Sequence, residues 1–302
     1  MKTSSIRLFL DSGAFSAFTQ GVKIDIQEYI QFIKQYEKHL EVYAVLDVIG
    51  DPAGTWRNQA IMERAGLKPL PCFHYGEDVK WLQKYLARGH DYIALGGMVP
   101  ISNTDLYPWL DTMFSKYLTD PKTGLPTIKV HGFGMTSFDL MLRYPWYSVD
   151  STSWIITGRT GGVYVPAFRD GKYNYRIPPF KVTVSNRSPD SAVDPDHIDC
   201  MPKRVRQLVL DYFTSKGYEL GSSEWREEPK DYKCQENERW CEKKVVRDKA
   251  GKGKVESIVK AGLSNDYRKR DELNIIYYAD LEKSMPEWPW PFKLKKKRGF
   301  GL

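Results

Sequence analysis

The chain has 302 residues, of which 41% are hydrophobic and 14% aromatic, so it can bury a core as one large domain or a domain with an appendage. No apolar run reaches about 18 residues, which excludes a membrane-spanning helix, and we expect no signal peptide at the start. Residues 1–200 carry 21 basic and 21 acidic side chains, whereas residues 201–302 carry 24 and 17, so the net charge of +7 comes from the last third. This distribution predicts a polyanionic partner, although a basic surface that only aids solubility has the same charge.

Short apolar runs that end in polar or glycine residues alternate with helical patterns over residues 6–153. The predicted strands are 8–10, 41–48, 70–76, 92–98, 127–134 and 146–153, and the predicted helices are 29–36, 53–65, 79–88, 105–118 and 137–143. This alternation is typical of βα units on a parallel sheet. We expect an α/β fold of the TIM-like (β/α) barrel type, with a doubly wound open sheet as the second choice.

The alternation ends after residue 153. Residues 161–177 predict a β-hairpin that turns at Asp170-Gly171, and residues 202–216 predict an amphipathic helix. Residues 219–272 are polar and weakly periodic, and residues 273–279 resemble one more strand. We therefore divide the chain into a barrel at 1–217, which includes the hairpin, and a basic extension at 218–302, which could complete the barrel and contact nucleic acid.

Three carboxylates and a pair of glycines follow predicted strands. Asp11, Asp47 and Asp150 each come at a strand end, and Gly96-Gly97 ends the fourth strand. Because the carboxyl ends of parallel strands meet at one edge, these groups should share one pocket. Taken singly, Asp11 could cap a helix and the glycines could form a tight turn, and His131 is more typical of a packed strand end.

These motifs resemble those of the tRNA-guanine transglycosylase superfamily. The chain has Asp-Ser-Gly-Ala-Phe at 11–15, Gly-Gly-Met at 96–98, Gly-Phe-Gly at 132–134, Val-Asp-Ser at 149–151 and Thr-Gly-Arg-Thr-Gly-Gly at 157–162, in the order of the family. The resemblance covers about residues 6–170. Ala14 replaces the second glycine of the family, and the zinc signature Cys-x-Cys-x-x-Cys is absent. These departures favour the DpdA-like DNA-guanine transglycosylases of phages.

The resemblance implies exchange of guanine in DNA for a 7-deazaguanine base, such as 7-cyano-7-deazaguanine, as a phage DNA modification against host restriction. It assigns Asp150 as the nucleophile on the sugar and Asp11 as the general acid and base. The substrate-binding residues that it implies are Asp47, Gly96, Gly97, Met98, Phe15, Ser12 and His74. Alternatives from the same chemistry or from other classes are a tRNA-guanine transglycosylase, a nucleoside deoxyribosyltransferase or hydrolase, and a non-catalytic nucleic-acid-binding barrel.

The expected partners are DNA, from which the target base must be flipped, and the free 7-deazaguanine base. The residues expected to contact phosphate are Arg159, Lys295, Lys296, Lys297 and Arg298. The basic tail could instead only aid solubility. The Trp-Pro-Trp-Pro-Phe segment at 288–292 could stack bases, but we expect it to pack the tail onto the body.

Cysteine spacing gives no metal motif. The four cysteines, Cys72, Cys200, Cys234 and Cys241, are spread along the chain, which fits a reducing cytoplasm, here that of the host cell if a phage encodes the protein. The last three could form a zinc site with His197, but their spacing does not support one. We therefore expect no cofactor and no metal, and the sequence leaves the oligomeric state open.

Overall fold

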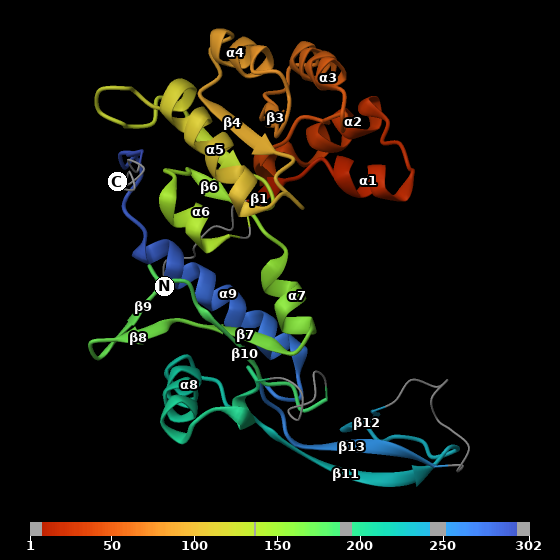
Figure 1. The fold of residues 1–302 in the computed structure, drawn as a ribbon. Coiled ribbons are helices and arrows are strands. Elements are labelled where there is room, and N and C mark those ends of the chain that lie inside the picture. The colour runs from red at the N-terminus through yellow and green to blue at the C-terminus, as the bar shows by residue number, and fades with distance from the viewer. Residues whose placement is uncertain (1–7, 136, 188–194, 242–251, 295–302) are drawn as a thin grey trace. The chain divides into compact units, whose positions relative to one another are not determined.

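The computed structural model describes residues 8–135, 137–187, 195–241 and 252–294 (Figure 1). The chain divides into two compact units, which are Met1–Ser151 with Pro286–Leu302, and Thr152–Met285. The predicted boundary at residue 217 lies inside the second unit, and the predicted hairpin belongs wholly to that unit. Each unit is described by itself below.

The first unit alternates strands and helices, as the sequence predicts (Figure 1). Its strands are β1 (Leu8–Leu10), β2 (Leu40–Tyr43), β3 (Cys72–His74), β4 (Tyr92–Gly96), β5 (Lys129–Gly132) and β6 (Ser148–Val149). Its helices are α1 (Ala14–Gln20), α2 (Ile26–Tyr36), α3 (Pro52–Arg64), α4 (Lys80–Ala87), α5 (Asn103–Met113) and α6 (Phe138–Arg143), with short turns at Glu37–His39 and Phe114–Leu118.

The strands of this unit are parallel and follow one another in chain order. β1 pairs with β2, and β3, β4, β5 and β6 form a second sheet in that order. A parallel bridge between Ala44 and Leu70 links the two sheets. The predicted α/β class with parallel strands is therefore confirmed, whereas the described residues do not show a closed barrel.

Polar caps and glycines set the ends of the helices around these strands. The Asp25 carboxylate accepts hydrogen bonds from the N–H groups of Gln27 and Glu28, which begins α2. Ser137 caps α6, since its hydroxyl accepts from the N–H of Leu140. Gly66 follows α3 with a positive φ of 87°, a conformation that favours glycine at a helix end.

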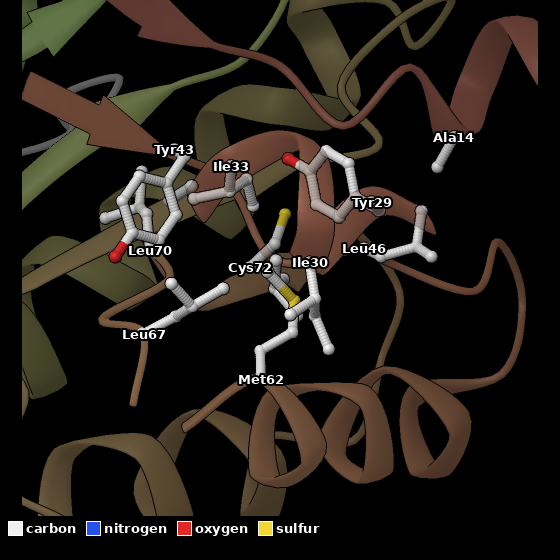
Figure 2. Packing of buried hydrophobic residues seen from close by; sticks show 12 residues of the cluster. Ala14, Tyr29, Ile30, Ile33, Tyr43, Leu46, Met62, Leu67, Leu70 and Cys72 are labelled. Atoms are coloured by element: carbon white, nitrogen blue, oxygen red, sulfur yellow. The ribbon is translucent and has the colours of Figure 1, made fainter. Parts of the chain in front are cut away.

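An apolar core lies between the first strands and their helices (Figure 2). Ile33 from α2 and Met62 from α3 are fully buried, and Cys72 of β3 lies among them. Burial of each side chain of this size contributes about 1.5–3 kcal/mol. The core therefore fixes the end of β3, where polar residues begin.

The tail returns to the first unit and packs on it. The ring of Phe292 is buried with its centroid 5.2 Å from that of Tyr144, and its N–H donates to the carbonyl of Gly124 over 2.9 Å. The indole N–H of Trp288 donates to the carbonyl of Pro145 over 3.2 Å. The expectation that the Trp-Pro-Trp-Pro-Phe segment packs the tail onto the body is confirmed.

The second unit combines short antiparallel sheets with helices. Its helices are α7 (Ser153–Arg159), α8 (Lys203–Ser215) and α9 (Tyr267–Ser284), with a short turn at Ile198–Cys200. Its strands are β7 (Gly162–Val165), β8 (Ala167–Arg169), β9 (Lys172–Asn174), β10 (Phe180–Thr183), β11 (Ser222–Pro229), β12 (Glu238–Trp240) and β13 (Lys252–Lys260). The turn at Asp170-Gly171 joins β8 to β9 as predicted, whereas β7 pairs with β10.

One prediction for this unit is wrong. Residues 273–279 lie inside α9 and form no strand, because Leu273, Tyr277 and Leu281 are buried at helical spacing. Residues 219–272, which are polar and weakly periodic and to which the sequence assigned no strand, contain the antiparallel sheet β11–β13–β12. Its strands escaped detection because Glu256, on β13, is buried among polar partners instead of apolar ones.

Candidate active site

Asp11 and Asp47, which follow the first two strands, are linked through a serine. Asp11 comes directly after β1, where Gly13 adopts a positive φ of 72° and donates its N–H to Asp11 Oδ1 over 3.3 Å. The buried hydroxyl of Ser12 donates to Asp47 Oδ1 over 2.8 Å. The predicted residues Asp11, Ser12 and Asp47 thus belong to one site.

His74, at the end of β3, lies between two carboxylates. Its Nε2 is 3.0 Å from Asp47 Oδ2, and its Nδ1 is 3.2 Å from Glu77 Oε1. The backbone N–H of His74 also donates to Glu77 Oε2 over 3.1 Å. An imidazolium can donate to both carboxylates, whereas a neutral imidazole can donate to only one of them.

The charge state of this cluster follows from its surroundings. Burial alone lowers the pKa of His74, but interactions with Cys72, Asp47 and Glu77 outweigh it and raise that pKa. Burial raises the pKa of the Cys72 thiol, so the sulfur is protonated and uncharged. The contact with Cys72 and the hydrogen bonds to Asp47 and Glu77 together favour the protonated imidazole of His74.

The glycine pair at the end of β4 makes room for the His74 ring. A Cβ on Gly96 would lie 2.9 Å from His74 Cδ2 and 3.0 Å from Cys72 Sγ. Gly97 has a positive φ of 68°, and a Cβ there would lie 3.2 Å from His74 Cβ. The pair thus lets β4 approach His74 closely, besides turning the chain at the strand end.

We expect Gly96→Ala to destabilise the protein by about 1–3 kcal/mol, because the added methyl group forces His74 or Cys72 to move. Urea unfolding measures this free energy in the wild type and in a His74→Ala background, where the ring is gone. A reduced cost in that background confirms the contact. An equal cost in both backgrounds contradicts it.

Asp150 follows β6 and is held by the end of β5. The N–H of Gly134, which has a positive φ of 61°, donates to Asp150 Oδ1 over 2.7 Å. His131 Nε2 lies 3.5 Å from the same oxygen, within ion-pair range but too far for a good hydrogen bond. The Asp150 side chain is 48% exposed, so a ligand can reach its carboxylate.

His131 is itself fixed by a buried network. Its Nδ1 is 2.6 Å from Ser148 Oγ, which in turn is 2.5 Å from the hydroxyl of Tyr92. Its ring stacks on Phe9 with centroids 4.5 Å apart. The ring is thus packed, as expected of a strand-end histidine, and it also directs Nε2 toward Asp150.

The charges of Asp47 and Asp150 act on Asp11. The pKa of Asp11 is raised, first by loss of hydrating water and then by the negative charges of Asp47 and Asp150. Carboxylates that share a site cannot all ionise freely, so one retains its proton at a higher pH than usual. Asp11 is thereby suited to carry a proton beside two other carboxylates.

The remaining predicted residues differ in their placement. Phe15 on α1 is 58% exposed and can stack on a flat ligand, whereas the Met98 side chain is only 3% exposed and packs inward. Arg159 lies on α7 of the second unit and is exposed. The tail residues Lys295, Lys296, Lys297 and Arg298 lie outside the described residues.

Four residues of this site were missed as functional by the sequence interpretation. Glu77 and Cys72 contact His74, while Gly134 and His131 adjoin Asp150. One signal was available, because Cys72 and His74 are two residues apart on a strand and so point to the same face. The contacts of Glu77 and Gly134 depend on turns that no sequence pattern reveals.

One cluster in the described part of the chain has the donors and spacing for a metal ion. Asp47, Cys72 and His74 each offer one ligand atom, and these atoms lie within 4.8 Å of one another. Over the same described residues, His197, Cys200, Cys234 and Cys241 form no such group, so the alternative zinc set considered from the sequence is not brought together.

Comparisons of the chain with protein-family models, with curated proteins and with solved structures give no match. No helix in the described ranges has both the length and the apolar character needed to cross a membrane.

Proposed function

We propose that the chain is a DNA-guanine transglycosylase that exchanges guanine for a 7-deazaguanine base through a covalent glycosyl-aspartate. The observation that supports this most directly is the open carboxylate of Asp150, which Gly134 holds by its N–H and whose charge reaches Asp11 and helps to raise the pKa of that carboxyl. A base-exchange reaction needs one carboxylate that remains anionic to attack the sugar and another that carries a proton. The order of the strand-end motifs agrees with the family that the sequence resembles.

In the first step, a carboxylate oxygen of Asp150 attacks C1′ of the deoxyribose while the bond from C1′ to N9 of guanine breaks. The electron pair of that bond leaves with guanine, and Asp11 supplies the proton that neutralises it. The product is an ester between Asp150 and C1′, with Asp11 now ionised. Gly134 donates to Asp150 Oδ1, which leaves Oδ2 for the attack.

In the second step, ionised Asp11 takes the proton from N9 of the incoming 7-deazaguanine. N9 then attacks C1′, and the ester bond to Asp150 breaks, which restores both carboxyl groups. Each of the two displacements inverts C1′, so the sugar keeps its original configuration overall, as in retaining glycosidases. The two steps together consume no water and use no cofactor.

The base is read by groups around Asp47. Each carboxylate oxygen has two acceptor positions, so Asp47 can accept from guanine N1–H and the exocyclic amine besides Ser12 and His74. In the described chain no hydrogen bond uses the N–H of Gly97 or Met98, and both can donate to the O6 atom. Phe15 stacks on the base from its exposed position on α1.

The barrel remains part of this proposal. β1 to β6 follow one another in order, and Phe9 of β1 contacts both His131 and Phe133 at the end of β5. Such contact between strands far apart in the order supports a strongly curved sheet of (β/α)-barrel type. The carboxyl ends of its strands would then surround one pocket.

The choice of DNA as the polymer rests on two features of the sequence. The excess of basic residues lies in the last third of the chain, and the zinc signature of the tRNA enzymes is absent. Arg159 and the tail cations Lys295 to Arg298 are the proposed phosphate contacts. A phage protein of this function would act in the cytoplasm of the host cell.

Exchange of labelled guanine tests the polymer. We expect label to leave duplex or single-stranded DNA when the protein and 7-cyano-7-deazaguanine are added, and to remain in tRNA and in free deoxyguanosine. Label that leaves only tRNA contradicts the choice of DNA, and label that leaves free nucleoside favours a deoxyribosyltransferase. Nucleic acid that binds without any loss of label indicates a binding protein without catalysis.

A further inference from the structure

Three side chains beside the proposed base pocket offer metal-ligand atoms that lie close together. His74 Nε2 lies 3.5 Å from Cys72 Sγ and 3.0 Å from Asp47 Oδ2. Ligand atoms at 2.0–2.3 Å from a tetrahedral zinc ion are roughly 3.3–3.7 Å apart. The two distances from His74 Nε2 are thus close to those of a zinc site, and all three donor atoms lie within 4.8 Å of one another.

The groups around these donors are those that metal centres use to orient their ligands. His74 Nδ1 faces Glu77 Oε1 at 3.2 Å, which is the carboxylate–histidine arrangement found behind metal-bound imidazoles. Asp47 Oδ1 accepts from Ser12 and leaves Oδ2 directed at His74. Gly96 keeps a Cβ away from both the imidazole and the sulfur.

The donor atoms and their burial indicate which kind of metal ion fits this site. Cys72 is 2% exposed and belongs to the apolar core in Figure 2, whereas Asp47 and His74 are partly open to solvent. A mixed sulfur, nitrogen and oxygen donor set suits zinc and similar transition metals, while magnesium and calcium prefer oxygen alone. An ion at this place can be reached from the side of Asp47 and His74.

We propose that Asp47, Cys72 and His74 bind one divalent transition-metal ion of the zinc class, with a fourth position left for water or a polar ligand atom. The ion would be held by the thiolate of Cys72, the imidazole of His74 and the carboxylate of Asp47. This site lies outside the double displacement, which proceeds between Asp11 and Asp150. It is also unrelated to the cysteine signature of the tRNA enzymes.

The test measures metal on the full-length protein without any substrate. Protein stripped with a chelator is titrated with Zn²⁺ and with Co²⁺, and bound metal is counted by mass spectrometry. We expect about one ion per chain, a higher Tm with Zn²⁺, and a thiolate-to-cobalt absorption band. Glu77→Gln should weaken binding by about 10–100-fold.

Matched variants distinguish metal binding at Cys72 and His74 from metal binding at other cysteines. Cys72→Ser and His74→Gln should each lose the bound ion and the cobalt band, whereas Cys200→Ser, an exposed cysteine of the second unit, should keep both. Circular dichroism identifies any variant that does not fold, and two ligand variants guard against that outcome. A folded wild type that binds no Zn²⁺, or ligand variants that bind as well as the wild type, overturns the proposal and leaves His74 as an ion-paired imidazolium. Guanine exchange, measured separately, decides the proposed function on its own.

Discussion

Asp150→Asn should lower the rate of guanine exchange by on the order of 10⁴-fold or more, because it removes the nucleophile and leaves the rest of the site in place. The amide oxygen of asparagine can still accept the N–H of Gly134, so the turn after β5 keeps its hydrogen bond. The measurement is release of labelled guanine from DNA under single-turnover conditions. In the absence of an incoming base, the wild type should also form a covalent protein–DNA adduct that survives denaturation.

The matched control for this variant is Asp170→Asn, at the tip of the β8–β9 hairpin. Asp170 is exposed with a positive φ of 52°, a conformation that asparagine adopts readily. The control should exchange guanine and form the adduct as the wild type does. If Asp150→Asn retains the adduct, another residue is the nucleophile and the double displacement must be assigned again.

Asp11→Asn should lower exchange by about 10²–10⁴-fold while the folded state becomes no less stable. The raised pKa of Asp11 means that its ionised form is disfavoured in the folded protein, first by burial and then by Asp47 and Asp150. Asparagine removes this unfavourable charge at neutral pH. Loss of activity together with an unchanged or higher Tm is the expected result, typical of a functional site that costs stability.

The pH dependence of this effect has a definite sign. Because the pKa of Asp11 is higher in the folded than in the unfolded protein, protonated Asp11 favours the folded state. This contribution to the free energy of unfolding is lost as the pH rises through the pKa of Asp11 in the folded protein. The difference in Tm between Asp11→Asn and the wild type should therefore be largest at neutral pH and vanish below pH 3.8, the ordinary pKa of an aspartate side chain. Thermal unfolding at several pH values measures it.

Asp78→Asn is the control with the opposite sign. Hydrogen bonds from Lys80 lower the pKa of Asp78, so its ionised form supports the folded state above the usual pKa of a carboxyl group. Its replacement should lower Tm at neutral pH and leave exchange unchanged. If Asp11→Asn lowers Tm at neutral pH as Asp78→Asn does, Asp11 is a structural carboxylate and not the proton carrier.

The packing of His131 keeps its imidazole directed at Asp150. Phe9 covers the imidazole and Ser148 fixes its Nδ1, so Nε2 stays directed at Asp150. The direct contact to the carboxylate comes from the backbone N–H of Gly134. An open carboxylate held by backbone keeps its second oxygen available to a ligand.

The sequence by itself determined the first half of the fold and the residue types of the site. Apolar runs that end in Asp11, Asp47 and Asp150 are local patterns, because strands of a parallel sheet tend to read as near-continuous apolar runs. β1 and β6 are nevertheless partly exposed, at Leu8 and Val149. Apolar patterns did not reveal the buried elements of the second unit. There Glu256 and Asn274 are buried by polar partners, and no local pattern distinguishes such residues from a solvated surface.

Only the tertiary structure decided how the site is assembled. The contacts of His74 with Asp47 and Cys72 join residues from different strand ends, and that of Gly134 with Asp150 depends on two turns meeting. Distances of this kind follow from how neighbouring strands pair and how closely glycines allow them to approach. The sequence therefore supplied the carboxylates, and the packing of β3 against β4 supplied the geometry of the His74 cluster.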